Sequence, residues 1–184
     1  MRVIAGALKG RRLRTPRGRQ TRPTSDQVRI ACLDTLAPWL SGARFLDLFA
    51  GAGGVGIEAL SRGSAECVFV EDDRSAVRAL RENLRDLGLE PRSRVLNLDV
   101  FRALDLLKAE GRPFSLVFVD PPYREVLAEQ TLGRLAARGL LAPAGVVAVQ
   151  HFTKQPPRDH VGCLTAFKRR RFGETTLLFF RAQE

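Results

Sequence analysis

From about residue 44 to residue 150 the chain alternates between short apolar runs and longer stretches of helical character. The apolar runs, which we interpret as strands, cover residues 44–48, 67–70, 94–98, 114–119 and 145–150. The stretches between them predict helices over residues 55–62, 74–87, 100–109 and 125–138. This alternation is typical of a parallel sheet with helices on both faces. A chain of 184 residues can build one domain with a sizeable core, so we predict an α/β fold.

The two ends of the chain depart from this alternation. Residues 163–172 and 175–180 flank Gly173-Glu174 and predict a closing antiparallel hairpin. Residues 1–38 predict an extension that packs on a main domain over residues 39–184. Its expected parts are a hairpin that pairs residues 3–5 with 12–14, a basic loop over 15–23, and a helix capped by Thr24-Ser25-Asp26 that ends near Leu36.

A glycine-rich segment follows the first predicted strand. Gly51, Gly53 and Gly56 have the spacing G-x-G-x-x-G, in which glycine lets the backbone turn tightly and approach a ligand closely. The next predicted strand leads into Glu71, which lies 20 residues after Gly51 (71 − 51), the usual distance to an acid that binds ribose hydroxyls. The segment therefore predicts a nucleoside-containing cofactor. The alternative is a glycine turn that is packed for helix–sheet contact.

Acidic residues near this segment indicate which cofactor fits. Asp47 would repel a pyrophosphate but could orient a cationic amino-acid moiety, directly or through water. S-adenosylmethionine carries an ammonium, a sulfonium and a ribose but no phosphate, so Asp47 and Glu71 together favour it. Asp99 could accept a hydrogen bond from the adenine amino group, cap the helix that follows, or do both. The predicted cofactor-binding residues are Asp47, Phe49, Gly51, Gly53, Glu71, Asp72, Asp99 and Val100.

The fourth predicted strand, over residues 114–119, leads into Asp120-Pro121-Pro122-Tyr123. The two prolines have a fixed φ and no N–H, so the turn is stiff and its carbonyls are free. Asp120 places an acceptor at the carboxyl end of the strand, where ligands bind in open α/β sheets. The Asp120 carboxylate and a free carbonyl of the turn are two acceptors. Together with the ring of Tyr123, they suit a planar base with an exocyclic amino group. Asp120, Pro121 and Tyr123 are therefore the catalytic candidates, and the alternative is a rigid turn with a surface tyrosine.

Positive charge is concentrated near the N-terminus. The net charge is +10, and residues 1–30 carry nine basic residues against one aspartate, which gives +8 (9 − 1). A basic segment on a nearly neutral body is typical of a protein that binds a polyanion, whereas a generally arginine-rich surface would not concentrate its charge there. Lys168 to Arg171 can extend this patch only in part, because alternate side chains of a strand point to opposite faces. The predicted RNA-binding residues are Arg11, Arg12, Arg14, Arg17, Arg19, Arg22 and Thr24.

Taken together, these motifs resemble the RsmD family of bacterial 16S ribosomal RNA guanine-N2 methyltransferases, over nearly the whole chain. The opening Met1 to Gly6 and the segment Thr21-Arg22-Pro23-Thr24 are specific to that family, whereas the glycine loop and Asp-Pro-Pro-Tyr occur in many amino-group methyltransferases. The other matching segments are Lys9 to Leu13, Val28-Arg29, Asp47 to Gly53, Glu71 and Arg171 to Thr175. One departure is Gln150-His151, where the family pattern has Glu-His.

The resemblance implies a Rossmann-like class I methyltransferase with a seven-stranded, mostly parallel sheet that ends in the antiparallel hairpin. It implies transfer of one methyl group from S-adenosylmethionine to N2 of a guanine in 16S ribosomal RNA. Asp120 and the Pro121 carbonyl would hold the amino hydrogens, and Tyr123 would stack on the base. The expected partner is 16S ribosomal RNA, within the small subunit or an assembly intermediate.

Three other functions share part of this pattern. Methylation of adenine N6 or cytosine N4 in DNA or another RNA uses the same Asp-Pro-Pro-Tyr. A nicotinamide-dependent oxidoreductase would leave Asp47 and the basic arm unexplained, and a non-catalytic RNA-binding protein would leave the acid-lined loop unexplained.

The remaining expectations concern compartment and assembly. The cysteines are scattered without a metal-site spacing, no apolar run approaches the ~20 residues that span a membrane, and the N-terminus lacks the apolar region of a secretory signal. We expect a monomer in a reducing cytoplasm, with no metal and no membrane contact.

Overall fold

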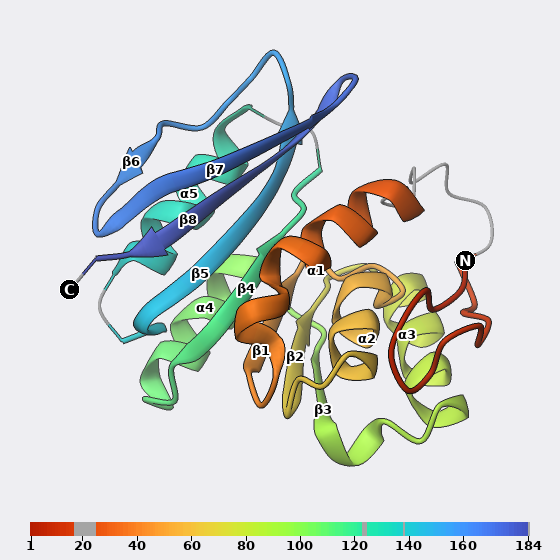
Figure 1. The fold of residues 1–184 in the computed structure, drawn as a ribbon. Helices are drawn as coiled ribbons and strands as arrows, with labels where there is room; N and C mark the ends of the chain where they lie inside the picture. Colours follow the sequence, from red (N-terminus) through yellow and green to blue (C-terminus); the bar gives the residue numbers. More distant parts are fainter. Residues whose placement is uncertain (17–24, 123–124, 138, 184) are drawn as a thin grey trace.

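Eight strands form one mixed sheet in the computed structural model, which describes residues 1–16, 25–122, 125–137 and 139–183. The order is β3-β2-β1-β4-β5-β8-β7-β6, with the first five strands parallel and the last three added antiparallel (Figure 1). The strands are β1 (Arg44–Leu48), β2 (Glu66–Val70), β3 (Ser93–Leu96), β4 (Phe114–Val119), β5 (Leu141–Phe152), β6 (His160–Val161), β7 (Leu164–Phe172) and β8 (Thr175–Ala182).

The predicted α/β class, the parallel sheet and the closing hairpin are confirmed. The sheet has one strand more than the seven expected, because the two-residue β6 pairs with the start of β7 through His160↔Thr165 and Val161↔Leu164. Two residues are too few to show a strand pattern in the sequence.

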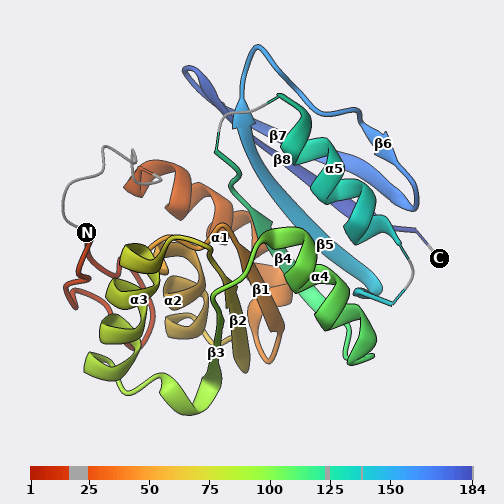
Figure 2. The ribbon, with the colours of Figure 1, turned by 180° about the vertical axis from the view of Figure 1, so that it is seen from behind.

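Five α-helices cover the sheet in the described part of the chain. They are α1 (Asp26–Leu40), α2 (Gly54–Ser61), α3 (Arg74–Asp86), α4 (Val100–Ala109) and α5 (Glu125–Ala136), with a 3₁₀ turn over Glu90–Arg92. Helices α1, α2 and α3 lie on one face, and α4 and α5 on the other (Figures 1 and 2). Among the described residues, no helix combines the length and the apolar character needed to cross a membrane.

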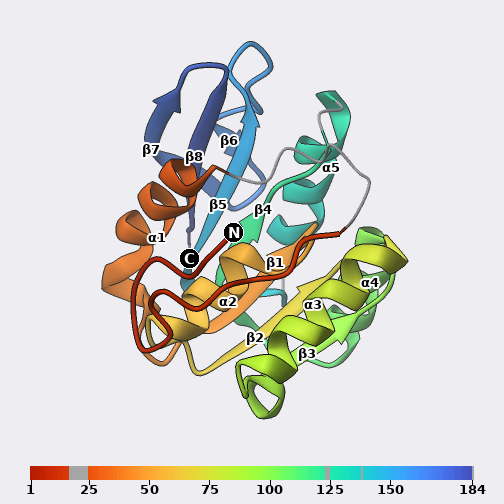
Figure 3. The same cartoon turned by 90° about the vertical axis from the view of Figure 1, so that its right-hand side faces the viewer.

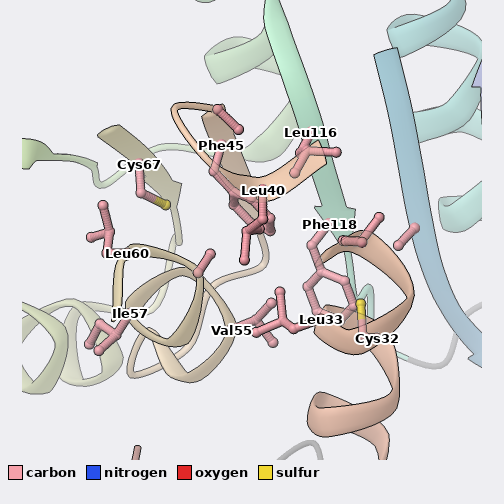
Figure 4. Packing of buried hydrophobic residues seen from close by; sticks show 14 of the residues in the cluster. Cys32, Leu33, Leu40, Phe45, Val55, Ile57, Leu60, Cys67, Leu116 and Phe118 are labelled. Atoms are coloured by element: carbon pink, nitrogen blue, oxygen red, sulfur yellow. The ribbon is translucent and has the colours of Figure 1, made fainter. Parts of the chain in front are cut away.

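Neighbouring residues of each central strand enter different halves of the core. Phe45 packs on the side of α1 to α3, together with Phe118 and with Leu33 of α1 (Figure 4). Leu46, the next residue, packs on the side of α4 and α5. Because helices cover both faces, the strands read as continuous apolar runs rather than as an alternating pattern.

Helix α1 is longer than the sequence predicted. Ser25 caps it by accepting a hydrogen bond from the Val28 N–H (3.3 Å), and the helix continues through Pro38 to Leu40. The predicted end near Leu36 was therefore wrong. Pro38 lies in the last turn, and Leu40 beyond it is buried in the core, so packing outweighs the cost of the proline there. The boundary predicted between residues 38 and 39 falls inside this helix, and the division into two domains stays a prediction.

The first sixteen residues form a shorter hairpin than predicted, and this hairpin is held on α2. Arg2 and Arg12 form an antiparallel bridge, and the N–H groups of Val3 and Leu13 donate to the carbonyls of Arg11 and Met1, both at 2.9 Å. The N–H groups of Ile4 and Ala5, which the hairpin would have used, both donate to the carboxylate of Glu58 in α2 at 2.8 Å. Figure 3 shows this segment running beside α2 toward α3.

Candidate active site

The candidate site residues meet at one edge of the sheet. The order reverses between β1 and β4, and ligands of open α/β sheets bind outside the carboxyl ends of the strands at such a switch point. Asp47 is the next-to-last residue of β1, Glu71 directly follows β2, and Asp120 directly follows β4. The sheet therefore brings three predicted acids to the same edge.

The loop after β1 has an unusual backbone. Phe49, Gly51 and Gly53 all have positive φ, at 61°, 56° and 87°. A left-handed conformation is costly for a bulky residue such as Phe49, and strain of this kind concentrates at functional sites. The loop is thus held in a specific shape between β1 and α2.

The three glycines of the loop serve two different purposes. A Cβ on Gly53 would lie 2.4 Å from Leu80 Cδ1, and a Cβ on Gly56 would lie 2.3 Å from Phe69 Cε1. These two glycines are needed for close packing of α2, which agrees with the alternative interpretation that the glycine turn serves helix–sheet contact. A Cβ on Gly51 would meet nothing within 4 Å. Gly51 therefore borders open space, as a ligand-facing position requires.

Glu71 ties the glycine loop to the end of β2. Its Oε2 accepts a hydrogen bond from the Gly51 N–H and its Oε1 accepts one from the Asp73 N–H, at 2.8 and 2.9 Å. Burial raises the pKa of this carboxyl above its ordinary value, although the two backbone donors act in the opposite direction. Asn97 was not predicted, and its amide donates to the carbonyls of Glu71 (2.9 Å) and Asp72 (3.1 Å). The side chain of Asp72 itself is exposed.

Asp47 lies beneath the loop and is almost fully buried, with 1% of its surface exposed. Its Oδ2 accepts a hydrogen bond from the Gly56 N–H at 2.8 Å. Burial is the main cause that raises its pKa to about 7, the Gly56 hydrogen bond lowers it, and the charges of Asp120 and Glu71 raise it further. Asp47 thus fixes the start of α2, and its predicted role toward a cationic cofactor stays a prediction.

Asp99 caps α4, which confirms one of its two predicted roles. Its Oδ1 accepts hydrogen bonds from the N–H groups of Phe101 (2.9 Å) and Arg102 (3.3 Å). The side chain is exposed, so contact with a ligand is also open to it. Val100 is buried in the core, whereas the Phe101 ring is partly exposed. Of these two, Phe101 is the better placed to pack on a ring.

The Asp-Pro-Pro segment continues β4 without a helix. Asp120 is half-buried, and its N–H lies 3.4 Å from the carbonyl oxygen of Leu48 in β1. Pro121 is buried and Pro122 is exposed. Tyr123 lies outside the described residues. The structure therefore places Asp120 and Pro121 beside the end of β1, next to the glycine loop.

Two of the N-terminal arginines, Arg11 and Arg14, lie against α3. Arg14 forms an ion pair with Asp86 at 3.0 Å, and Arg11 donates to the Asp86 carbonyl oxygen at 3.0 Å. Asn83 of α3 holds the backbone of Arg14 by accepting from its N–H (2.7 Å) and donating to its carbonyl (3.1 Å). The amide of Asn83 also donates to the carbonyl of Ala52 (3.0 Å), so it connects the basic segment to the glycine loop.

Other predicted RNA-binding residues, Arg17, Arg19, Arg22 and Thr24, lie outside the described residues, and the side chain of Arg12 is exposed. Sequence reasoning missed Asn83 and Glu58. A lone carboxylate in the otherwise apolar α2 was the available signal for Glu58, which is fully buried. No signal in the sequence marked Asn83.

The sheet order, the acid-lined glycine loop and the Asp-Pro-Pro segment at the end of β4 define a class I methyltransferase. The family model described as "Conserved hypothetical protein 95" matches residues 1–181. The chain is 36% identical to the protein YlbH of Bacillus subtilis over 98% of each chain. It is 39% identical to the ribosomal RNA small subunit methyltransferase D of Escherichia coli, over 82% of this chain and 74% of the relative.

A solved structure agrees with these sequence matches. The Escherichia coli protein YhhF superposes with a TM-score of 0.87 at 33% identity, covering 100% of this chain and 98% of that one. The chain belongs to the RsmD family of methyltransferases.

Proposed function

We propose that this protein transfers a methyl group from S-adenosylmethionine to the exocyclic N2 of a guanine in 16S ribosomal RNA. The observation that carries the proposal is the meeting of Asp120 and Pro121 with the acid-lined glycine loop at one edge of the sheet. The Escherichia coli relative is a ribosomal RNA small subunit methyltransferase by name, which supports the choice of substrate.

The residues present fit S-adenosylmethionine. Gly51 borders open space, and carboxylates at Glu71, Asp72 and Asp99 line the ends of β2 and β3. Glu71 would hold the ribose hydroxyls, and Asp99 or Phe101 would contact the adenine. Such a set of acids favours a cation and disfavours a pyrophosphate. The cofactor would supply an electrophilic methyl group, and the loop would position it.

Asp120 and Pro121 would orient the nucleophile. The lone pair of a guanine amino group is delocalised into the base, so the nitrogen attacks poorly unless it is aimed. The Asp120 carboxylate and the Pro121 carbonyl would accept its two hydrogens, and this restraint lowers the barrier by orientation. The carboxylate also favours the positive charge that develops on nitrogen during transfer. Tyr123 would stack on the guanine after it leaves its own stack.

The N-terminal arginines would contact phosphates around the target. The side chain of Arg14 is 61% exposed in its pair with Asp86, and an exposed pair of this kind exchanges readily for a phosphate. The substrate would be the small subunit or an assembly intermediate, and we propose that the enzyme acts as a monomer. All three cysteines are free thiols, which suits a reducing cytoplasm.

Replacing Asp120 tests the assignment. Asp120→Ala should abolish methyl transfer to small subunits of a strain that lacks this protein, while calorimetry shows S-adenosylmethionine affinity within a few-fold of the parent. Asp105→Ala is the matched control and should keep full transfer. It removes an exposed acid of α4 that pairs with Arg134 of α5. Retained transfer in Asp120→Ala, or loss of its cofactor binding, would contradict the assigned role.

A further inference from the structure

A group of aromatic and basic side chains lies on the α1 side of the terminal strands, away from the site described above. We call it the hairpin face, and its members are Trp39, Phe167, Lys168, Arg170 and Arg181. Strands β7 and β8 extend the sheet beyond α1 (Figure 3). Phe167 is 44% exposed, one of three large apolar side chains of the described chain that are substantially exposed.

Strand pairing fixes which side chains share this face. Lys168 pairs with Phe179 and Arg170 pairs with Leu177, and both apolar partners belong to the core on the α1 side. Directly paired residues of antiparallel strands lie on the same face of the sheet. Arg170 reaches α1, where its Nη1 lies 3.4 Å from Thr35 Oγ1. Two cations of β7 are therefore on the same side as α1.

The aromatic members form a stack with an arginine. The Trp39 and Phe167 rings meet edge to face with centroids 6.2 Å apart. The Arg181 guanidinium lies 5.1 Å from the Trp39 centroid and 5.3 Å from the Phe167 centroid. Rings and guanidinium planes at the surface are the groups on which unpaired nucleic-acid bases stack.

No carboxylate of the described residues neutralises the cations of the hairpin face, although Arg170 contacts Thr35 and Arg181 lies over the two rings. Among the described residues, none of Lys168, Arg170 and Arg181 forms an ion pair with a carboxylate. Arg169, on the opposite side of the same strand, does so, with Asp159 at 2.7 Å. Cations left without carboxylates beside exposed rings complement a polyanion that carries bases.

We propose that the hairpin face binds single-stranded ribosomal RNA next to the methylated base. This inference rests on the proposed function and extends it to a second RNA contact. A second copy of the chain does not fit, because a twofold interface would bring these cations against themselves. The residues of β7 lead toward the hairpin tip at Gly173, which lies at the same end of the sheet as the carboxyl end of β5. From Phe167 to Phe172 the strand spans about 17 Å at ~3.3 Å per residue.

Fluorescence of Trp39 tests this directly, because it is the only tryptophan in the chain. A 16S ribosomal RNA transcript and purified small subunits, each added to the full-length protein with S-adenosylhomocysteine, should quench the emission saturably. A transcript that is retained in filter binding without a change in emission would overturn the proposal. A change with small subunits but not with a bound transcript would assign the face to a ribosomal protein and overturn it as well.

Variants on the two sides of β7 give the second test. Phe167→Ala should weaken RNA binding by roughly tenfold. Arg170→Ala should lower the salt slope of log K by about 0.7, the value for one phosphate on a single strand. Arg169→Ala, one residue away on the opposite side, is the matched control and should leave the slope unchanged. Equal effects of the two arginine variants would refute the face assignment.

Labelled methyl transfer by the parent protein separates the two failures. If the parent protein methylates RNA but Phe167→Ala and Arg170→Ala bind RNA as tightly as the parent does, the RNA-binding role of the hairpin face alone is overturned. Absence of both transfer and RNA binding in the parent would remove the proposed function and this inference with it.

Discussion

The buried carboxylate of Asp47 should make the stability of the protein depend on pH in a way that one substitution removes. Its pKa is about 7 in the folded protein against an ordinary value of 3.8, chiefly because of burial. Between these values the folded protein binds a proton that the unfolded chain does not. The stabilisation from this group is complete below pH 4, decreases as pH rises, and is lost as pH passes through about 7.

The magnitude follows from the two pKa values. A shift of about three units corresponds to about 4 kcal/mol, of which about 2.5 kcal/mol should be lost between pH 5 and pH 8. This is a large share of the roughly 5–15 kcal/mol by which domains are stable. Asp47→Asn removes the titration and keeps an oxygen that can accept the Gly56 hydrogen bond.

Urea unfolding of the cofactor-free protein at pH 5 and pH 8 provides the assay. The parent should lose about 2.5 kcal/mol more unfolding free energy across this interval than Asp47→Asn does. Val68→Ala, which truncates a buried apolar side chain on the neighbouring β2, is the control and should lower stability equally at both pH values. A difference between the parent and Asp47→Asn that does not change with pH would refute the reasoning.

Three further predictions concern the same part of the molecule. Because a bound cation favours ionised Asp47, S-adenosylmethionine affinity by calorimetry should rise between pH 6 and pH 8, and a flat profile in the parent would exclude that contact. Glu58→Ala should lower the unfolding free energy by about 3–5 kcal/mol in chemical denaturation, since it leaves the N–H groups of Ile4 and Ala5 unpaired and removes the carboxylate that pairs with Arg62 and lies beside buried Arg29; a loss below about 1 kcal/mol would contradict the anchoring role. Gly53→Ala should destabilise the fold by thermal melting more than Gly51→Ala, whereas Gly51→Ala should weaken cofactor binding; equal melting losses would refute the different roles of the two glycines.

The sequence predicted the sheet because its signals are local and strong. Runs such as residues 114–119 are apolar throughout, since helices cover both faces of the strand, and the turn at Gly173-Glu174 separates two β-rich runs. The carboxyl ends of parallel strands share one edge, so the meeting of Glu71 and Asp120 also followed from the pattern.

What the sequence could not show depends on contacts between distant residues. The N–H groups of Ile4 and Ala5 could have paired within a hairpin, and only the position of Glu58 in the fold turns them toward α2. Likewise, the pattern identified Asp47 as an acid near the glycine loop but not its burial beneath that loop. Asn83 bridges Arg14 and Ala52, which are far apart in the chain, so no local sequence pattern could predict this contact.

The proposed activity is best tested by the transfer of labelled methyl from S-adenosylmethionine to small subunits of a strain that lacks this protein, followed by nucleoside analysis. We expect label in N2-methylguanosine of 16S ribosomal RNA. Label in another nucleoside would contradict the substrate while keeping the amino-group chemistry of Asp120. Absence of label from all nucleic acid, with the cofactor bound, would contradict methylation of ribosomal RNA by this protein.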